Sequence, residues 1–258
     1  MKKIIFVFSI VLLAMLATST AQANHSWNTY HWGRTSNPFT LKLGDNVSDT
    51  WDTYLSTAST DWTVSSILNT TIVAGLGGKS CKPTRGRVEV CNRTYGNNGW
   101  LGLAQIWISG SHITQGVVKM NDTYFNKTFY NNPNEKLHVV CQEVGHTLGL
   151  DHQSEDGSSQ NTCMDYFSNT GTNAGSTLST HPNQHDYEQL GIIYAHLDAT
   201  SPSSTTKKGN GNVNAIVDLD DSSAWGKKIR ESENKKTSVF ERDLGKGNKV
   251  FTFVTWAE

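Results

Sequence analysis

One segment, residues 141–152, constrains the fold of this chain more than any other. It reads Cys-Gln-Glu-Val-Gly-His-Thr-Leu-Gly-Leu-Asp-His, and apolar residues at helical spacing predict a helix over 133–148. Positions i and i+4 of a helix lie on one face about 6 Å apart, so the side chains at 142 and 146 can approach one another. Gly149 can adopt the left-handed conformation, which would end the helix and bring His152 back toward His146.

Three side chains of this segment can then bind one metal ion. Gln142 and His146 share a helix face, and His152 supplies a third donor after the turn. Three protein ligands leave a position for water, which is typical of a catalytic rather than a structural site. Glu143, beside the first ligand, can take a proton as this water attacks a carbonyl. The pattern therefore predicts peptide hydrolysis without a covalent intermediate.

At these residues the chain resembles the metzincin metallopeptidases, whose signature is His-Glu-x-x-His-x-x-Gly-x-x-His followed by a methionine turn. The signature positions after the first are matched by Glu143, His146, Gly149 and His152. Met164 lies where the methionine turn is expected, whereas Gln142 replaces the first histidine. An amide oxygen is a weaker donor than imidazole, so the ion should be held less tightly. Some gametolysin-like members carry this glutamine, so the resemblance implies Zn²⁺, with Cu²⁺ as the alternative.

The resemblance also implies roles for residues outside the signature. Tyr166 is similar to the tyrosine of astacins and serralysins that helps to hold the oxyanion; a packed aromatic side chain is the other interpretation. Residues 101–105 resemble the matrixin edge strand, along which a peptide substrate adds as a further strand. A matrixin propeptide with its cysteine switch is missing, so any latency is expected to arise otherwise.

Four cysteines in an exported chain predict two disulfides. Cys81 and Cys91 flank a segment with Pro and Gly that suits a turn between two strands, so we expect these two to pair. Cys141 and Cys163 are left to form the second bridge, which would join the predicted helix to the loop after it. Thiolate metal ligands are the alternative.

The N-terminus has the features of a secretory signal peptide over residues 1–23. A charged start precedes an apolar run over 4–16 and an Ala-Gln-Ala site that ends at Ala23. No later segment approaches the roughly 20 apolar residues that a spanning helix needs. The sequence therefore predicts a chain secreted to the extracellular space or periplasm, without stable membrane insertion.

The pattern of the whole chain predicts an α/β (α+β) fold. The resemblance, which covers roughly residues 37–198, implies a metzincin-like domain over 24–199 with a twisted mixed sheet, an active-site helix and a Met-turn. Residues 200–212 are rich in Ser, Thr, Lys and Gly and read as a linker before a small β-rich module over 213–258. Strands are expected at 37–45, 67–74, 101–108, 113–120, 216–219, 238–241 and 250–256, and helices from Ser48 or Asp49 to Trp62, over 133–148 and over 185–197.

Composition limits the partners. A net charge of −1 without a basic stripe excludes a nucleic-acid partner, because such proteins neutralise phosphates with clustered Lys and Arg. The expected partner is a protein or peptide substrate, and the chain is expected to be a monomer. The rival hypothesis is a weakly active or inactive pseudoprotease that binds extracellular polymers or proteins through its C-terminal module.

Overall fold

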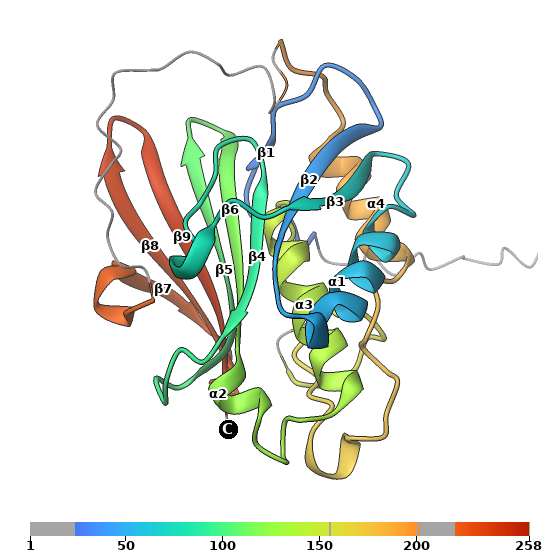
Figure 1. Cartoon of the computed structure of the whole chain (residues 1–258). Coiled ribbons are helices and arrows are strands. Elements are labelled where there is room, and N and C mark those ends of the chain that lie inside the picture. Colours follow the sequence, from blue (N-terminus) through green and yellow to red (C-terminus); the bar gives the residue numbers. More distant parts are fainter. Residues whose placement is uncertain (1–23, 155, 200, 202–219, 258) are drawn as a thin grey trace, which may run out of the picture.

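The computed structural model describes residues 24–154, 156–199, 201 and 220–257. Within these ranges the protein is a mixed α/β fold, in which one nine-stranded sheet carries helices beside part of its surface (Figure 1). The expected signal peptide over 1–23, most of the linker and the strand at 216–219 lie outside the described residues. No helix in the described part of the chain is long and apolar enough to cross a membrane.

The strands and helices follow one another along the chain. The strands are β1 (His31–Trp32), β2 (Phe39–Asn46), β3 (Leu68–Ala74), β4 (Val88–Arg93), β5 (Trp100–Ser109), β6 (His112–Asn121), β7 (Lys227–Glu231), β8 (Thr237–Gly245) and β9 (Asn248–Trp256). The helices are α1 (Asp49–Trp62), α2 (Asp122–Phe125), α3 (Pro133–Thr147) and α4 (Gln184–Ile193). Three short 3₁₀ turns are η1 (Gly78–Ser80), η2 (Gly171–Asn173) and η4 (Ser222–Ala224).

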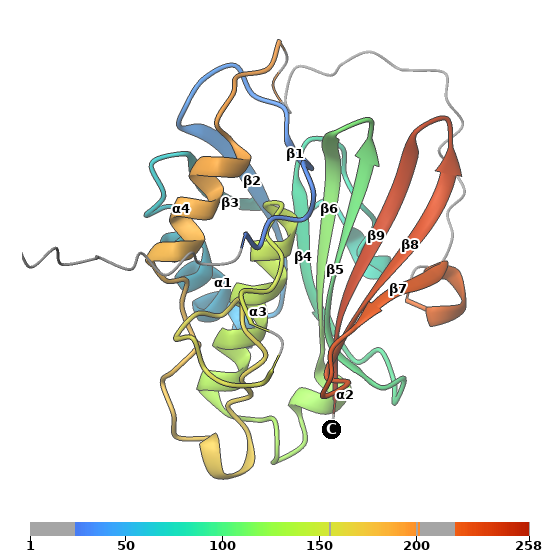
Figure 2. The same ribbon diagram turned by 180° about the vertical axis from the view of Figure 1, so that it is seen from behind.

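The sheet has the order β3-β2-β4-β6-β5-β9-β8-β7, and β1 also pairs with β6. Strands β3, β2, β4 and β6 are parallel to one another, whereas β5, β9, β8 and β7 alternate in direction. Figure 2 shows α1, α3 and α4 together on one side of the sheet, with the C-terminal strands at its far edge. The mixed sheet and its helices agree with the expected α/β class at this coarse level.

Strand β5 is an inner strand, so the expectation that residues 101–105 form a sheet edge is wrong. It pairs antiparallel with β6 on one side and with β9 on the other, where Leu103 lies opposite Val254. The strands after residue 219 thus extend the main sheet instead of forming a sheet of their own. Sequence periodicity locates strands well, but it does not show which strand lies beside which.

Tertiary contacts hold both ends of α3. Asn132 caps its start by accepting a hydrogen bond from the Glu135 amide at 2.9 Å, and Pro133 occupies the first turn. At the other end, the last carbonyl groups of the helix have no partner within it. They accept hydrogen bonds from donors elsewhere in the chain. The Trp32 indole donates to the Thr147 carbonyl at 2.8 Å, and the Tyr194 hydroxyl donates to the Leu148 carbonyl at 2.9 Å.

The helix expected over 185–197 is shorter in the structure. It begins with a capping box between Asn183 and Asp186 but ends at Ile193. The Arg34 guanidinium donates to the Tyr194 carbonyl, and the Asp198 amide donates to the Arg34 carbonyl at 2.6 Å. These contacts turn the chain away from the helix axis, and the local apolar pattern does not reveal them.

Both expected disulfides form, between Cys81 and Cys91 and between Cys141 and Cys163. The expected hairpin between the first two cysteines is wrong, however. Cys81 follows η1, and Cys91 lies in β4, which is parallel to β2. The bridge therefore fastens a loop to the sheet, while the second bridge fastens the loop that holds Met164 to α3.

Gly145 should be intolerant of a side chain, because α3 passes close to its neighbours there. An added Cβ would lie 2.7 Å from the Trp62 ring and would also meet the Met164 sulfur. We expect Gly145→Ala to lower the free energy of unfolding by about 1–3 kcal/mol, as overpacked cores do. Urea unfolding measures the change.

Gly191 provides the matched control, since it also lies in a helix but faces open space. Gly191→Ala should leave the free energy of unfolding unchanged or raise it by up to about 1 kcal/mol, through helix propensity and a less flexible unfolded chain. Equal effects of the two substitutions would contradict the close packing at Gly145.

Candidate functional site

Two histidine rings meet at the end of α3. Gly149 has a φ of +97°, and an added Cβ would lie 2.5 Å from the Tyr30 carbonyl oxygen, so only glycine fits this turn. The chain reverses there, and the Nε2 atoms of His146 and His152 lie 3.1 Å apart with their rings inclined at 75°. The structure thus brings together the two histidines that the sequence predicts as partners.

A hydrogen bond of His146 shows which of its two ring nitrogens carries the proton. Its Nδ1 lies 3.0 Å from the Leu150 carbonyl oxygen, which can only accept, so Nδ1 carries the proton. Burial, with His152 close by, lowers the pKa of His146 well below its ordinary value, so the ring is neutral. Its Nε2 lone pair therefore points toward His152, as in a histidine that binds a metal.

The spacing of these two nitrogens fits a zinc or copper ion. Two nitrogens bound at about 2.0–2.1 Å in tetrahedral geometry are about 3.3 Å apart. Imidazole suits both ions. Tyr166 lies behind the pair, since its hydroxyl is 2.9 Å from Nδ1 of His152 and its ring is 4.2 Å from the histidine ring. Tyr166 therefore packs on His152 and orients it.

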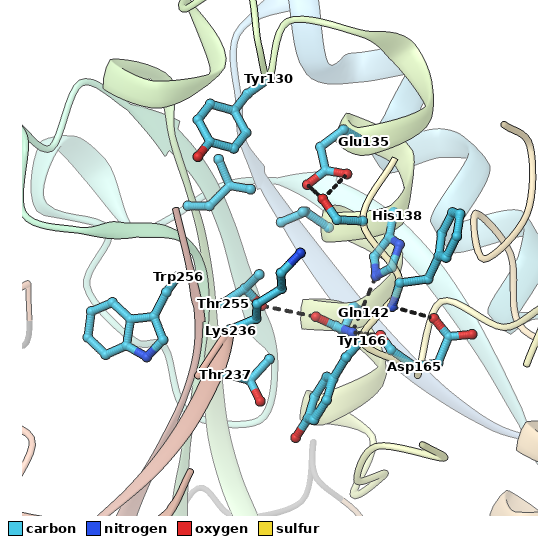
Figure 3. A pocket seen from close by; sticks show the side chains of 14 residues that line it. Tyr130, Glu135, His138, Gln142, Asp165, Tyr166, Lys236, Thr237, Thr255 and Trp256 are labelled. Carbon is cyan, nitrogen blue, oxygen red and sulfur yellow. Dashed lines mark hydrogen bonds between the residues drawn. The ribbon is translucent and has the colours of Figure 1, made fainter. Parts of the chain in front are cut away.

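Gln142 lies on the same face of α3, one turn before His146, and its amide orientation follows from its partners. Nε2 donates to the carbonyls of Cys163 and Asp165 at 3.0 and 2.7 Å. Because both partners are acceptors, the nitrogen belongs on that side and Oε1 on the other. Oε1 accepts from the Thr255 hydroxyl at 3.0 Å, as Figure 3 shows, and it is the one side-chain atom of Gln142 that could bind a cation.

Glu143 is fully buried against β5. Its Oε1 accepts from the Thr255 hydroxyl at 2.8 Å, whereas Oε2 has no hydrogen-bond partner among the described residues. An added Cβ at Gly102 would lie 2.9 Å from Oε1, so the glycine makes room for the carboxyl group. Burial raises the pKa of Glu143 to about 8, and the bond from Thr255 offsets only part of this effect. A buried polar atom without a partner marks a place for a polar ligand.

Met164, at the position of the expected methionine turn, lies against α3 with its sulfur beside Gly145. Its amide donates to the Thr162 hydroxyl at 3.0 Å, and its carbonyl accepts from the Gln153 amide at 2.6 Å. The bridge from Cys163 to Cys141 holds this loop against α3. All the predicted site residues are therefore gathered in one place: Gln142, Glu143, His146, Gly149, His152, Met164 and Tyr166.

The C-terminal strands cover this site, which no pattern in the sequence indicates. The Phe253 ring of β9 stacks on His146, with centroids 4.4 Å apart and planes inclined at 9°. The Thr255 hydroxyl reaches both Gln142 and Glu143. Alternation along β9 puts these two side chains on one face of the strand. The sequence predicts that strand, but not the helix face against which it lies.

A partly buried ion pair fastens the same strands beside His152. The two terminal guanidinium nitrogens of Arg230, near the end of β7, donate to the Asp151 carboxylate. Burial alone would raise the pKa of Asp151, but its bonds to His152 and Arg230 outweigh this and hold it well below its ordinary value. Asp151 is thus a carboxylate between a site histidine and the C-terminal strands.

A small cavity of about 20 Å³ opens beside Gln142. Its wall combines α3, the loop after Met164 and the C-terminal strands (Figure 3). Glu135 lies in this wall, and burial raises the pKa of its carboxyl group, although His138 and the Asn169 amide act in the opposite sense. Figure 3 shows the Lys236 side chain extending into the cavity with its ammonium group on the side of Glu135. The cavity thus holds a basic side chain from the C-terminal segment.

Comparisons of the chain with models of known protein families and with curated proteins find no match. The geometry of the site is therefore the basis for a functional proposal.

Proposed function

We propose that this chain is a secreted metal-dependent endopeptidase of the metzincin type, in a latent form that its own C-terminal strands close. The observation that carries the proposal is the pair of converging Nε2 atoms on His146 and His152. Glu143 on the same helix adds a buried carboxylate with one unpartnered oxygen. A purely structural role would not explain why this oxygen is buried without a hydrogen-bond partner.

The residues that would hold the ion are His146, His152 and, through Oε1, Gln142. The neutral amide should bind the ion less tightly than a third imidazole would. The proposed ion is Zn²⁺, with Cu²⁺ as the alternative. When bound, such an ion polarises the scissile carbonyl and lowers the pKa of water. The fixed Nδ1 proton of His146 and the Tyr166 contact of His152 hold both rings in position for binding.

Glu143 acts in the proposal as the general base. A carboxyl group with a pKa of about 8 holds its proton in the covered state, because desolvation disfavours the charge. Displacement of Thr255 by a substrate and water would solvate the group and return its pKa toward the ordinary range. Glu143 then takes a proton from the attacking water and passes it to the leaving amine. Tyr166 stabilises the oxyanion after its hydroxyl leaves His152.

Strand β9 lies where a peptide substrate would bind. Extended substrates add to a sheet by pairing with a free strand, and here β9 pairs antiparallel with β5 along its whole length. Thr255 occupies the hydrogen-bonding position of Glu143, Phe253 covers His146, and Lys236 enters the adjoining cavity. The C-terminal strands thus resemble a bound peptide, and their displacement is the activating step.

The rival function, a pseudoprotease that binds extracellular partners, has one observation in its favour. The Gln142 amide is tied to two carbonyls and to Thr255, so it already satisfies its hydrogen bonds without an ion. Such a residue can serve as a structural anchor in an inert site. Two substitutions, one at Glu143 and one at Gln142, separate the hypotheses.

Replacement of Glu143 should abolish cleavage but not metal binding. In the opened Phe251→Ala background described next, we expect Glu143→Ala to lower the rate of casein or gelatin cleavage by about 10²–10⁴-fold, because general-base catalysis is lost. Bound metal, measured by mass spectrometry on secreted residues 24–258, should remain near the level of the Phe251→Ala protein. Glu188→Gln in the same background, an exposed change on α4, is the control. Equal cleavage by the Phe251→Ala protein with and without Glu143→Ala would refute the proposed mechanism.

Loosening β9 should increase cleavage. Phe251 anchors β9 by packing on Trp27 and Tyr30. Among the described residues, its ring does not stack on His146 or His152. We expect Phe251→Ala to raise the initial rate about 10–100-fold, because the lost packing shifts the population toward the open state.

The matched control is Phe125→Ala, which removes an equally buried ring that packs on Trp51 of α1 rather than on the C-terminal strands. It should change the initial rate much less. A Phe251→Ala protein that stays folded yet remains as inactive as the parent would argue against latency through β9.

Replacement of Gln142 by histidine tests the rival directly. In the Phe251→Ala background, Gln142→His should tighten zinc binding about 10-fold or more, because imidazole is the better donor. A peptidase should already be active before this change. If Gln142→His alone installs activity in an inert parent, the natural protein is a binder, and the catalytic proposal fails.

A further inference from the structure

Three histidine side chains from three distant segments converge on one carboxylate oxygen of Asp198, away from the proposed catalytic site. Oδ1 of Asp198 lies 3.1 Å from Nε2 of His112, 3.4 Å from Nε2 of His31 and 3.5 Å from Nε2 of His196. His31 begins β1, His112 begins β6, and the other two follow α4. We call these four residues the Asp198 cluster. The donor atoms of His31, His196 and Asp198 all lie within 4.8 Å of one another.

Hydrogen bonds orient the members of the Asp198 cluster. The Nδ1 atom of His31 lies 2.7 Å from the Thr29 carbonyl oxygen, which can only accept, so Nδ1 carries a proton. In the neutral ring, Nε2 then presents its lone pair to the Asp198 carboxylate. Two lone pairs that face each other repel, unless a proton or a metal ion lies between them. A backbone carbonyl behind the other ring nitrogen is the arrangement that metal-bound histidines use.

A proton on each ring is the less favourable solution. A carboxylate oxygen has only two lone pairs for three N–H donors, and a charged His31 would lie close to two further rings, whose centroids are 4.9 Å away at His112 and 4.8 Å away at His196. One divalent ion satisfies His31, His196 and Asp198 together, since their donor atoms lie within 4.8 Å of one another and ligands bound at about 2.0–2.2 Å are separated by about 3.3 Å.

The carboxylate is held in place independently of any ion. Its Oδ2 accepts from the Arg34 amide at 3.1 Å and lies 3.6 Å from the guanidinium, so Oδ1 is left to face the three histidines. The side chains of His31 and Asp198 are 3% and 9% exposed, whereas those of His112 and His196 are 39% and 60% exposed. The cluster therefore has a fixed inner half and an outer half that an ion can reach.

We propose that His31, His196 and Asp198 form a structural binding site for a divalent transition metal, with zinc as the favoured ion. Two imidazoles and one carboxylate supply three protein ligands, and a water molecule can complete the tetrahedral set, while His112 keeps its hydrogen bond to the same carboxylate oxygen. The ion would fasten the N-terminal segment to the chain after α4. It would thereby fix the Arg34 contacts that end this helix. This proposal does not depend on peptidase activity.

Zinc titration of the metal-stripped full chain tests the proposal. His196→Ala should weaken binding at this site by at least about 100-fold, because a direct ligand contributes more than the groups behind it. Asp198→Asn should do the same. His181→Ala is the control, since this exposed histidine pairs with Asp61 alone at 2.7 Å and should bind zinc like the parent. Zinc should also raise the melting temperature of the parent and the control by roughly 5 °C, but not that of the cluster variants.

The His146→Ala/His152→Ala double variant separates the Asp198 cluster from the proposed catalytic site. With Co²⁺ as a coloured substitute for zinc, this variant should keep one visible tetrahedral spectrum that His196→Ala then removes. Loss of that spectrum in the double variant alone, with full binding in His196→Ala, would overturn the proposal. Equal stoichiometry and affinity in the parent, Asp198→Asn and His196→Ala would overturn it too.

Discussion

The reversal of the chain at Gly149 is the constraint on which the site depends. Its φ of +97° and the close approach of the Tyr30 carbonyl leave no space for a side chain. The turn is fixed from outside the helix, because the Trp27 amide donates to the Gly149 carbonyl at 2.8 Å and the Asp151 amide donates to the His25 carbonyl at 2.6 Å. The N-terminal segment of the described chain therefore holds His152 against His146.

Burial under β9 changes the chemistry of every group in the site. In a poorly solvated interior the charged form of an acid or a histidine is disfavoured, so Glu143 tends to be protonated and His146 tends to be neutral. Asp151 stays charged because His152 and, from the C-terminal strands, Arg230 hydrogen-bond to its carboxylate. One of the two groups that keep this carboxylate charged therefore comes from the strands that cover the site.

The two groups of histidines differ in a way that bears on their proposed roles. His146 and His152 are buried beside an unpartnered carboxyl oxygen and a third, weaker donor. The Asp198 cluster instead offers two imidazoles and one fixed carboxylate from segments far apart in the sequence, and it is open to solvent on one side. A site beside an unpartnered carboxyl group suits chemistry, whereas a site that ties distant segments together suits structure. We therefore propose a catalytic metal ion for His146 and His152 and a structural one for the Asp198 cluster.

The sequence by itself determined the local parts of this protein. Helical spacing that begins at Pro133 located α3, alternation located β2, and the even number of cysteines led to both disulfides. The i, i+4 rule and one glycine were enough to group Gln142, His146 and His152, because all three lie within a few turns of backbone.

Only the tertiary structure decided what lies opposite these elements. The pairing of β9 with β5 makes an inner strand of an expected edge and places Thr255 on Glu143. Arg34 ends α4 early, and Asp198 gathers histidines from three segments. The physical reason is that local backbone hydrogen bonds follow from neighbouring residues, whereas a strand or a charged group can satisfy its bonds with many distant partners. Packing of the whole chain selects among those partners.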